Sequence, residues 1–413
     1  MISTKRDARI IINALKNGGI PKNYLEELVV GREKEIKEFN RNLENLEYNT
    51  GGFKIVLDNY GTGKTFLVNL LKEISLKKDY VVSYFPVDRS FRFNKLDDLY
   101  YYIMHNLYIK NYENNASFSN IFDIWISNLK KAPDKMQATN EINYVIKEMK
   151  KYNDTFARAL LSYIRYKIND DEKMIDVVTS WLSGEKNIPF KMKKKFNVKG
   201  SIDKSNVFDF LKGFSKLIDL LGYKGLVVIV DEIDLILNER VDIRKDAYNN
   251  IKHIIDLCAS GDLNKTFFML TGSKNIVENE EKGFRSNEAL SQRLGQAIDS
   301  YSSEINDIRQ PIIELSNINM KTLEKLTNKI IKIYKLAFDV KLKISNISLR
   351  NWVLYTYQKN DKDVNELKIR EFITRLLQIL DTIEQNPNNH IYDKNLKMSY
   401  NGNKLIFTNQ LTN

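Results

Sequence analysis

The residues from Asp58 to Thr65 have the types and the spacing that bind the phosphates of a nucleotide. They spell DNYGTGKT, which follows the phosphate-binding loop (P-loop) pattern G-x-x-x-x-G-K-[ST] except at its first position. In that pattern glycines let backbone N–H groups turn toward phosphate, the lysine contacts the β- and γ-phosphates, and the hydroxyl binds Mg²⁺. Lys64 supplies the charge here and Thr65 the metal ligand. The expected ATP contacts are Asn59, Tyr60, Gly61, Thr62, Gly63, Lys64, Thr65 and Phe66.

The first position of the loop holds Asp58 where the pattern has glycine. Aspartate tolerates unusual backbone angles better than most residues, so the loop can still form. Its charge near phosphate should weaken nucleotide binding unless the side chain points away. The alternative interpretation of the stretch is a glycine turn beside a chance lysine.

Two acidic residues, Asp231 and Glu232, end the apolar run that begins at Leu226. This order is typical of a Walker B strand, in which the first carboxylate holds Mg²⁺ through water and the second is the general base for the attacking water. We therefore expect Asp231 to be a metal ligand and Glu232 to be catalytic. A further run ends in Thr271-Gly-Ser273, where a polar side chain would touch the γ-phosphate or the attacking water as a sensor. The sequence does not separate Thr271 from Ser273 in this role.

Short apolar, partly β-branched runs predict the strands that must position these residues. We expect parallel strands over 53–57, 80–87, 225–232, 266–271 and 311–315. The spacing elsewhere is helical. The predicted division is an N-terminal helical segment (1–48), a nucleotide-binding core (49–107 and 206–317), a helical insertion without comparable strands (108–205), a helical lid (318–385) and a polar tail with at most a small hairpin (386–413).

Lysines gather at the end of the predicted insertion. Residues 186–204 hold seven lysines and one aspartate, a local charge of 7 − 1 = +6 within a chain of net charge +11. Such a cluster favours contact with a polyanion, most simply nucleic acid, and its alternative is a solvated lysine-rich loop. The candidate contacts are Lys191, Lys193, Lys194, Lys195 and Lys199.

Composition excludes several other classes of protein. With 43% hydrophobic and 28% charged residues the 413-residue chain is typical of globular proteins, and its apolar runs are too short to span a bilayer. The N-terminus predicts a helix and lacks a signal-peptide cleavage pattern, so we expect a cytoplasmic protein. Cys258 is the single cysteine, and the three histidines are scattered, which excludes an intrachain disulfide and a zinc pattern.

The motif VGRE, from Val30 to Glu33, precedes the P-loop and resembles the entry of origin-recognition-like AAA+ ATPases and of STAND ATPases. The resemblance implies that Gly31 and Arg32 pack near the adenine. It also implies roles for arginines that follow: Arg285 or Arg293 as an arginine finger, and Arg370 or Arg375 as a second sensor.

Over its length up to the lid the chain resembles the AAA+ ATP-binding proteins of BREX phage-defence systems, the BrxD type. The segments that carry the resemblance are LKNGGIP, VGRE, DNYGTGKTF, WLSGEKNIPF, LIDLLGYKGLVVIVDEIDLIL and NEEKGFRSNEALSQRL. It implies an α/β AAA+ fold with a parallel five-stranded sheet of order 5-1-4-3-2, helices on both faces, a helical insertion and a C-terminal helical lid.

The same resemblance implies an ATPase that uses ATP and Mg²⁺ as a switch, on or near DNA, beside a helicase and other defence proteins and as a candidate homo-oligomer. One alternative is a nucleotide-binding scaffold in which Asp58 has reduced hydrolysis. Another is a STAND-like signalling ATPase, which is less favoured because no repeat pattern follows the predicted lid.

Overall fold

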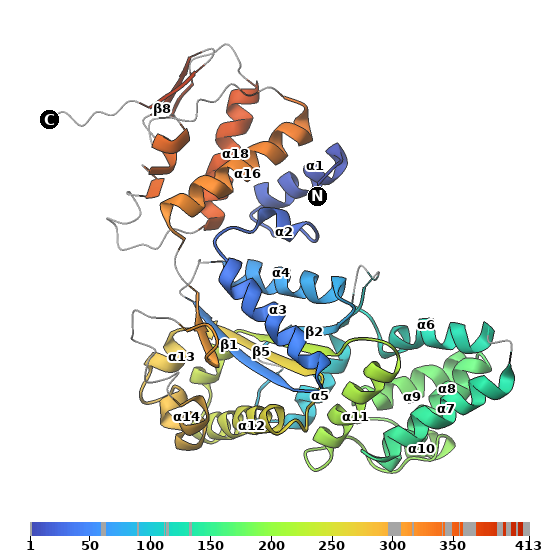
Figure 1. The fold of residues 1–413 in the computed structure, drawn as a ribbon. Helices are drawn as coiled ribbons and strands as arrows, with labels where there is room; N and C mark the ends of the chain where they lie inside the picture. Colours follow the sequence, from blue (N-terminus) through green and yellow to red (C-terminus); the bar gives the residue numbers. More distant parts are fainter. Residues whose placement is uncertain are drawn as a thin grey trace. The chain divides into compact units, whose positions relative to one another are not determined.

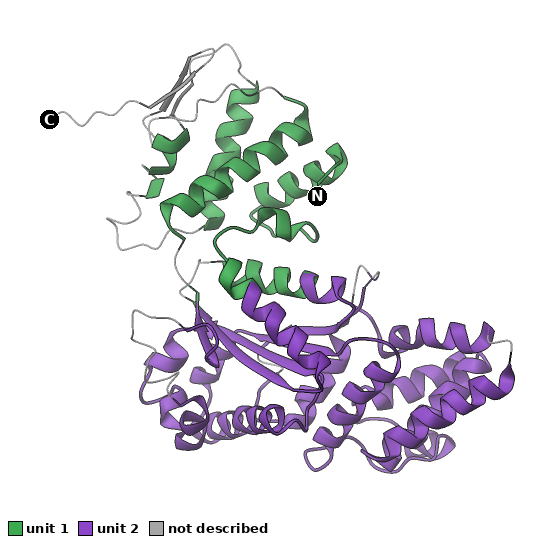
Figure 2. Ribbon diagram, in the orientation of Figure 1, with its two compact units in different colours: residues 1–36, 58–73, 315–413 green, residues 37–57, 74–314 purple. Residues whose placement is uncertain are grey.

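The structure is a computed structural model whose fold is drawn in Figure 1. It describes residues 2–58, 63–88, 91–110, 112, 115–131, 134–295, 307–315, 318–340, 342, 349–354, 356–357, 369–385, 391–393, 398–401 and 404–407. The chain forms two compact units, coloured in Figure 2: unit 1 comprises residues 1–36, 58–73 and 315–413, and unit 2 comprises residues 37–57 and 74–314. Each unit has a hydrophobic core of its own.

Unit 2 is built around a six-stranded sheet of order β3-β2-β4-β5-β1-β6. The strands are β1 (Gly52–Asp58), β2 (Val81–Pro86), β3 (Leu107–Tyr108), β4 (Leu226–Asp231), β5 (Thr266–Ser273) and β6 (Ile312–Glu314). β2 pairs parallel with β4, β4 with β5, and β1 with β6. Every residue of β4 is buried, as expected for a central strand covered on both faces.

The sheet has one strand more than expected, so its full order differs from the expected one, while the five expected strands lie in the expected order β6-β1-β5-β4-β2. A sixth strand, β3, pairs antiparallel with β2 at the sheet edge through Val82↔Tyr108 and Ser83↔Leu107. The prediction of a purely parallel five-stranded sheet was therefore wrong at this edge. A two-residue strand is too short to show a period in the sequence, so the sequence could not predict it. In the structure Leu107 is buried.

Helices cover both faces of the sheet, with α3 (Glu33–Glu47) and α12 (Val241–Ser260) on opposite sides in Figure 1. The apolar stripe Phe39, Leu43 and Leu46 of α3 is buried, and the Phe39 ring meets the edge of Phe267 on β5 at 5.5 Å between centroids. Among the described residues outside the predicted insertion, the remaining helices of this unit are α5 (Leu96–His105), α11 (Val207–Leu220), η1 (Ile233–Asn238), α13 (Asn275–Glu278), η2 (Phe284–Ser286) and α14 (Glu288–Leu294). Helix α4 (Lys64–Lys77) is divided between the two units after Glu73.

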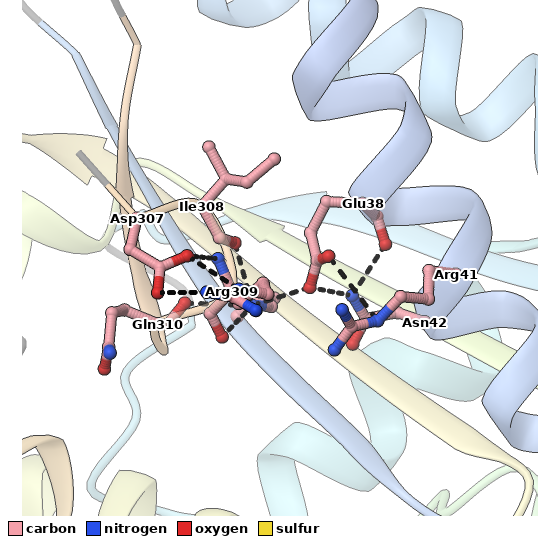
Figure 3. A network of polar contacts seen from close by, with 8 residues as sticks. Glu38, Arg41, Asn42, Asp307, Ile308, Arg309 and Gln310 are labelled. Carbon is pink, nitrogen blue, oxygen red and sulfur yellow. Dashed lines mark hydrogen bonds and ion pairs between the residues drawn. The ribbon is translucent and has the colours of Figure 1, made fainter. Parts of the chain in front are cut away.

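A buried polar network fixes the segment that leads into β6 (Figure 3). The Lys54 ammonium, on β1, donates to the carbonyls of Ile308, Arg309 and Gln310 at 3.1, 2.7 and 2.9 Å. It also lies 3.0 Å from the Glu38 carboxylate of α3. Burial lowers the pKa of the Lys54 ammonium, and its bond to Glu38 opposes that effect. The network joins α3, β1 and the start of β6, because a buried charge is tolerated only when it is paired.

The predicted insertion is helical apart from β3. It contains α6 (Phe118–Lys131), α7 (Lys135–Lys150), α8 (Asp154–Ile168), α9 (Glu172–Leu182) and α10 (Phe190–Lys195). Asp134, Asn153 and Asp171 precede three of these helices, and each side chain accepts a hydrogen bond from a backbone N–H of the first turn. These N-caps explain where the helices begin.

The core of unit 1 joins helices from both ends of the chain. It contains α1 (Lys5–Lys16), α2 (Leu25–Leu28), α16 (Met320–Phe338) and α18 (Ile369–Gln385). Ala8, Ile11 and Ile12 of α1 are fully buried against the apolar faces of α16 and α18. Lys16 is 2.6 Å from Asp381, and the Arg9 Nε donates to the carbonyl of Ala337 at 2.8 Å. Residues 1–48, expected as one segment, are thus divided between the two units after Ile36.

The C-terminal residues include three short antiparallel strands, β7 (Ile391–Asp393), β8 (Met398–Asn401) and β9 (Lys404–Phe407), in the order β7-β8-β9. The expected hairpin is therefore one strand larger. Among the described residues, no helix combines the length and the apolar character needed to cross a membrane.

Candidate nucleotide-binding site

The predicted P-loop lies between the end of β1 and the start of α4. β1 ends at Asp58 and α4 begins at Lys64, so the strand and the helix fall where the motif needs them. Gly63 has φ +101°, a conformation that side chains rarely adopt. The backbone N–H groups at the start of α4 have no partners within the helix and suit an anion. Asn59, Tyr60, Gly61 and Thr62 lie outside the described residues, and their contacts stay predictions.

Asp58 and Lys64 form an ion pair within unit 1. Their side chains are 5% and 15% exposed, and the Asp58 Oδ1 lies 3.9 Å from the Lys64 Nζ. The Asp58 side chain therefore faces the P-loop lysine, whereas the sequence left its direction open.

The VGRE segment is held against helices of unit 1. Gly31 has φ +66°, and a Cβ there would lie 2.8 Å from the methyl of Thr322, so any side chain at this position would be strained. The Arg32 side chain is 5% exposed and lies 3.3 Å from the Glu35 carboxylate. Lys329 of α16 donates to the carbonyl of Val29 at 2.8 Å. The segment is therefore anchored on α16.

Two further predicted residues, Phe66 and Arg370, lie in the same unit. Phe66 packs against the unit 1 core. Ile369, the first residue of α18, has its Cδ1 3.7 Å from the position of a Cβ on Gly63, so α18 begins beside Gly63. The next residue is Arg370, whose aliphatic stem instead lies against Gly18, with its Cδ 3.3 Å from the position of a Cβ there.

The Walker B candidate Asp231 ends β4 as a 4% exposed carboxylate that receives several hydrogen bonds. The Thr271 hydroxyl, from β5, donates to its Oδ1. The Tyr84 hydroxyl, from β2, donates to its Oδ2 at 3.4 Å. Burial, followed by the negative charge of Asp231, raises the pKa of Tyr84 well above its ordinary value. Because β2, β4 and β5 are parallel, their carboxyl ends meet at one edge of the sheet, where ligands bind in folds of this kind.

Glu232 follows with φ +60°, an uncommon conformation for a residue other than glycine. Its side chain is exposed, in contrast to the buried Asp231, and its backbone N–H donates to Asp231 Oδ1 at 2.9 Å. The turn thus separates the two carboxylates, with one held inside and one directed outward. Strained backbone of this kind concentrates at functional sites.

The two sensor candidates differ in their surroundings. Thr271 is fully buried and its hydroxyl contacts Asp231 directly. Ser273 is partly buried, and its backbone N–H donates to the Asp234 carboxylate at 2.9 Å. The structure brings Thr271, and not the Ser273 hydroxyl, into contact with the Asp231 carboxylate.

Two residues at this edge were missed by the sequence analysis. Tyr84 reaches Asp231 because Tyr84 pairs in register with Ile229, two residues before Asp231. Lys274, directly after β5, forms an ion pair with Glu314 at the end of β6. Neither residue belongs to a local motif, so their contacts could be found only from the order and register of the strands.

The two finger candidates lie near α14 and pair within the chain. Arg293 Nε donates to Asp256 on α12, and Arg285 lies 3.7 Å from Glu280. The Arg293 side chain is 46% exposed.

The lysine cluster lies on and after α10. Lys191, Lys194, Lys195 and Lys199 are exposed and Lys193 is half-buried, while the Phe190 ring at the start of α10 is 68% exposed. Lys186 pairs with Asp97 and Asp98, and its hydrogen bond to Asp97 raises its pKa. The exposed charge is therefore concentrated from Lys191 onward.

A mostly parallel sheet with carboxylates and hydroxyls at the carboxyl ends of its strands defines an α/β protein of the kind that binds ligands at that edge. The model of one family, "BREX system ATP-binding protein BrxC/D", matches residues 3–397, and the chain belongs to this family. The chain is accordingly an ATP-binding component of a BREX phage-defence system. No curated protein matches it.

Proposed function

We propose that this protein is an AAA+ ATPase that hydrolyses ATP as a switch in phage defence. The observation that carries the proposal is the turn at Asp231 and Glu232. The Asp231 carboxylate is buried and accepts hydrogen bonds from two hydroxyls, whereas Glu232 is exposed. This division suits a metal-binding carboxylate beside a general base.

The residues present fit Mg²⁺. Asp231 and Thr65 offer oxygen ligands, which Mg²⁺ prefers, and it is usually held by one or two carboxylates together with substrate phosphates. A Mg²⁺ ion held by these residues would neutralise charge at the phosphates.

The chain's own residues then have separate tasks. Lys64 binds the β- and γ-phosphates, and the start of α4 presents backbone N–H groups to them. Glu232 accepts a proton from the attacking water. Thr271 and Tyr84 hold the Asp231 carboxylate in one orientation.

We further propose that the protein acts in the cytoplasm, on or near DNA, with a helicase or other BREX proteins and as a homo-oligomer. The exposed lysines of α10 support a polyanion contact. The second candidate function is a nucleotide-binding scaffold with little hydrolysis, which the Asp58–Lys64 ion pair favours because it occupies the lysine.

The test compares ATP turnover of the full chain with and without duplex DNA, and repeats it for Glu232→Gln. We expect the substitution to preserve ATP binding and to lower turnover by about 100-fold or more, because it removes the base and keeps Asp231. Asp242→Asn is the matched control, since Asp242 is an exposed acid on α12 paired with Arg240. Turnover at the unaltered rate in Glu232→Gln, or no turnover in the unaltered chain under any condition, would favour the scaffold.

A further inference from the structure

Asp58 stands where a P-loop has glycine, and its carboxylate faces the lysine of the same loop. Asp58 is the last residue of β1, so its backbone is extended and its Cβ causes no strain. The departure from glycine therefore leaves the strand intact and adds one negative charge, 3.9 Å from the Lys64 ammonium.

Both charges are largely removed from water, with side chains 5% and 15% exposed. Opposite charges about 4 Å apart attract each other several times more strongly at such a site than in bulk water. A nucleotide phosphate that takes Lys64 as its partner must compete with this carboxylate, and it then lies close to a charge of its own sign. Both effects oppose nucleotide binding.

We propose that Asp58 is a built-in competitor of the nucleotide phosphates for Lys64. It holds the lysine in the nucleotide-free protein and sets a low affinity for ATP. The inference rests on the proposed function, because it takes the ATP phosphates as the ligand of Lys64.

The proposal predicts two effects of opposite sign for Asp58→Asn, which keeps the shape of the side chain and removes its charge. The nucleotide-free protein should unfold at a lower temperature, because the ion pair between Asp58 and Lys64 is lost. ATP should nevertheless bind about tenfold more tightly or better, which corresponds to about 1.4 kcal/mol. A role in structure alone predicts that stability and affinity both fall.

The experiment titrates ATP with Mg²⁺ into the unaltered chain, Asp58→Asn, Asp58→Gly and Asp58→Glu by calorimetry, with thermal unfolding of each protein without nucleotide. Asp58→Gly restores the motif glycine and provides a second neutral variant if Asp58→Asn folds poorly. Asp58→Glu retains the charge and should bind no more tightly than the unaltered chain. Asp79→Asn is the charge control, because Asp79 pairs with Lys110 at 2.9 Å with a 54% exposed side chain.

The proposal is upheld if both neutral variants gain affinity and the charged variant and control do not. It is overturned if the unaltered chain binds ATP and the neutral variants bind no more tightly, or if Asp79→Asn gains as much. If the unaltered chain binds ATP and the neutral variants bind no more tightly, only the inference about Asp58 fails, and the proposed function stands. If neither the unaltered chain nor the neutral variants bind ATP, the proposed function fails and the inference fails with it.

Discussion

At the scale of single residues, the Asp231 carboxylate is the best-supported part of the site. Its oxygens receive hydroxyl donors from the two neighbouring strands, Thr271 on β5 and Tyr84 on β2. Hydrogen bonds to a charged acceptor are stronger than those between neutral groups, and a buried carboxylate that loses a donor is costly. The hydroxyl contacts therefore orient Asp231 as well as stabilise it.

Thr271→Val tests this contact, because valine keeps the branched shape and removes the hydroxyl. We expect a loss of stability of about 1–3 kcal/mol, together with lower ATP turnover and nearly unchanged ATP affinity. Ser273→Ala is the matched comparison, since the Ser273 backbone, which alanine retains, makes the bond to Asp234. Steady-state turnover and denaturant unfolding of both variants measure the two effects. A larger loss of turnover in Ser273→Ala would assign the sensor to Ser273.

Local motifs carry the part of the site that the sequence could predict. Lys64 and Asp231 stand in short patterns with fixed spacing, so their elements could be placed without a structure. Tyr84 and Lys274 could not be found in this way, because their partners come from other strands. The direction of the Asp58 side chain was equally inaccessible, since both of its possible directions fit the same sequence.

At the scale of elements, α1 belongs with α16 and α18 although most of the chain separates them. Its buried face, with Ala8, Ile11 and Ile12, follows the helical spacing of the sequence, which does not identify its partner helices. Periodicity shows which face of a helix is buried and does not show what covers it. The sixth strand β3 was missed for a different reason, because two residues carry no period.

Ile12→Ala should therefore destabilise unit 1. Ile12 is fully buried, and removal of such a side chain costs about 2–5 kcal/mol. Ile10→Ala is the control on the same helix, because the Ile10 side chain is 53% exposed. Urea unfolding of the full chain, with proteolysis of the C-terminal region as a second readout, compares the two. Equal stability of both variants would contradict the packing of α1 on α16 and α18.

The short helix α10 gives a second prediction at this scale. Replacing Lys193, Lys194 and Lys195 by glutamine should weaken DNA binding evenly across sequences, because lysines that bind phosphate do not read the bases. It should also flatten the salt dependence by about one unit of log-log slope for each phosphate that no longer has a lysine partner.

The control for α10 replaces three exposed lysines that already have partners. Lys110, Lys130 and Lys151 pair with Asp79, Asp170 and Glu148. Replacing these three lysines by glutamine removes the same total charge as the α10 variant does. Fluorescence anisotropy with labelled duplex DNA, at several salt concentrations, measures both sets. The cluster would be a solvated lysine-rich surface if the α10 variant left the salt slope unchanged. The same would hold if the control variant flattened the slope equally.

At the scale of the whole molecule, the question is whether one chain completes its own site. The proposed AAA+ function implies an arginine finger that a neighbouring subunit supplies. Arg293 is the first candidate, and within the chain it pairs with Asp256, which also binds Lys252 at 3.0 Å. Because the Arg293 side chain is 46% exposed, it can exchange Asp256 for a partner outside the chain.

A mixing experiment separates a finger in trans from a salt bridge within the chain. Arg293→Ala and Lys64→Ala should each lack turnover alone, the first for want of a finger and the second for want of the phosphate-binding lysine. Combined, they should regain part of the activity, because some interfaces then pair an intact P-loop with an intact Arg293. A cationic finger can contribute about 10³-fold or more to turnover, so the recovery should be easily measured. Arg285→Ala mixed with Lys64→Ala tests the second candidate in the same assay.

Asp256→Asn is the control for the salt bridge, since it removes the partner of Arg293 and leaves the arginine in place. If Arg293 acts only through Asp256, both single variants should lose stability alike, and mixing should restore nothing. If Arg293 acts in trans, Asp256→Asn should keep its turnover, because the guanidinium still reaches the neighbouring γ-phosphate. Light scattering with ATP and DNA must show an assembly under the conditions of the assay. Mixed assemblies that remain inactive would rule out Arg293 in trans, and a chain that stays monomeric would rule out any finger from a second copy.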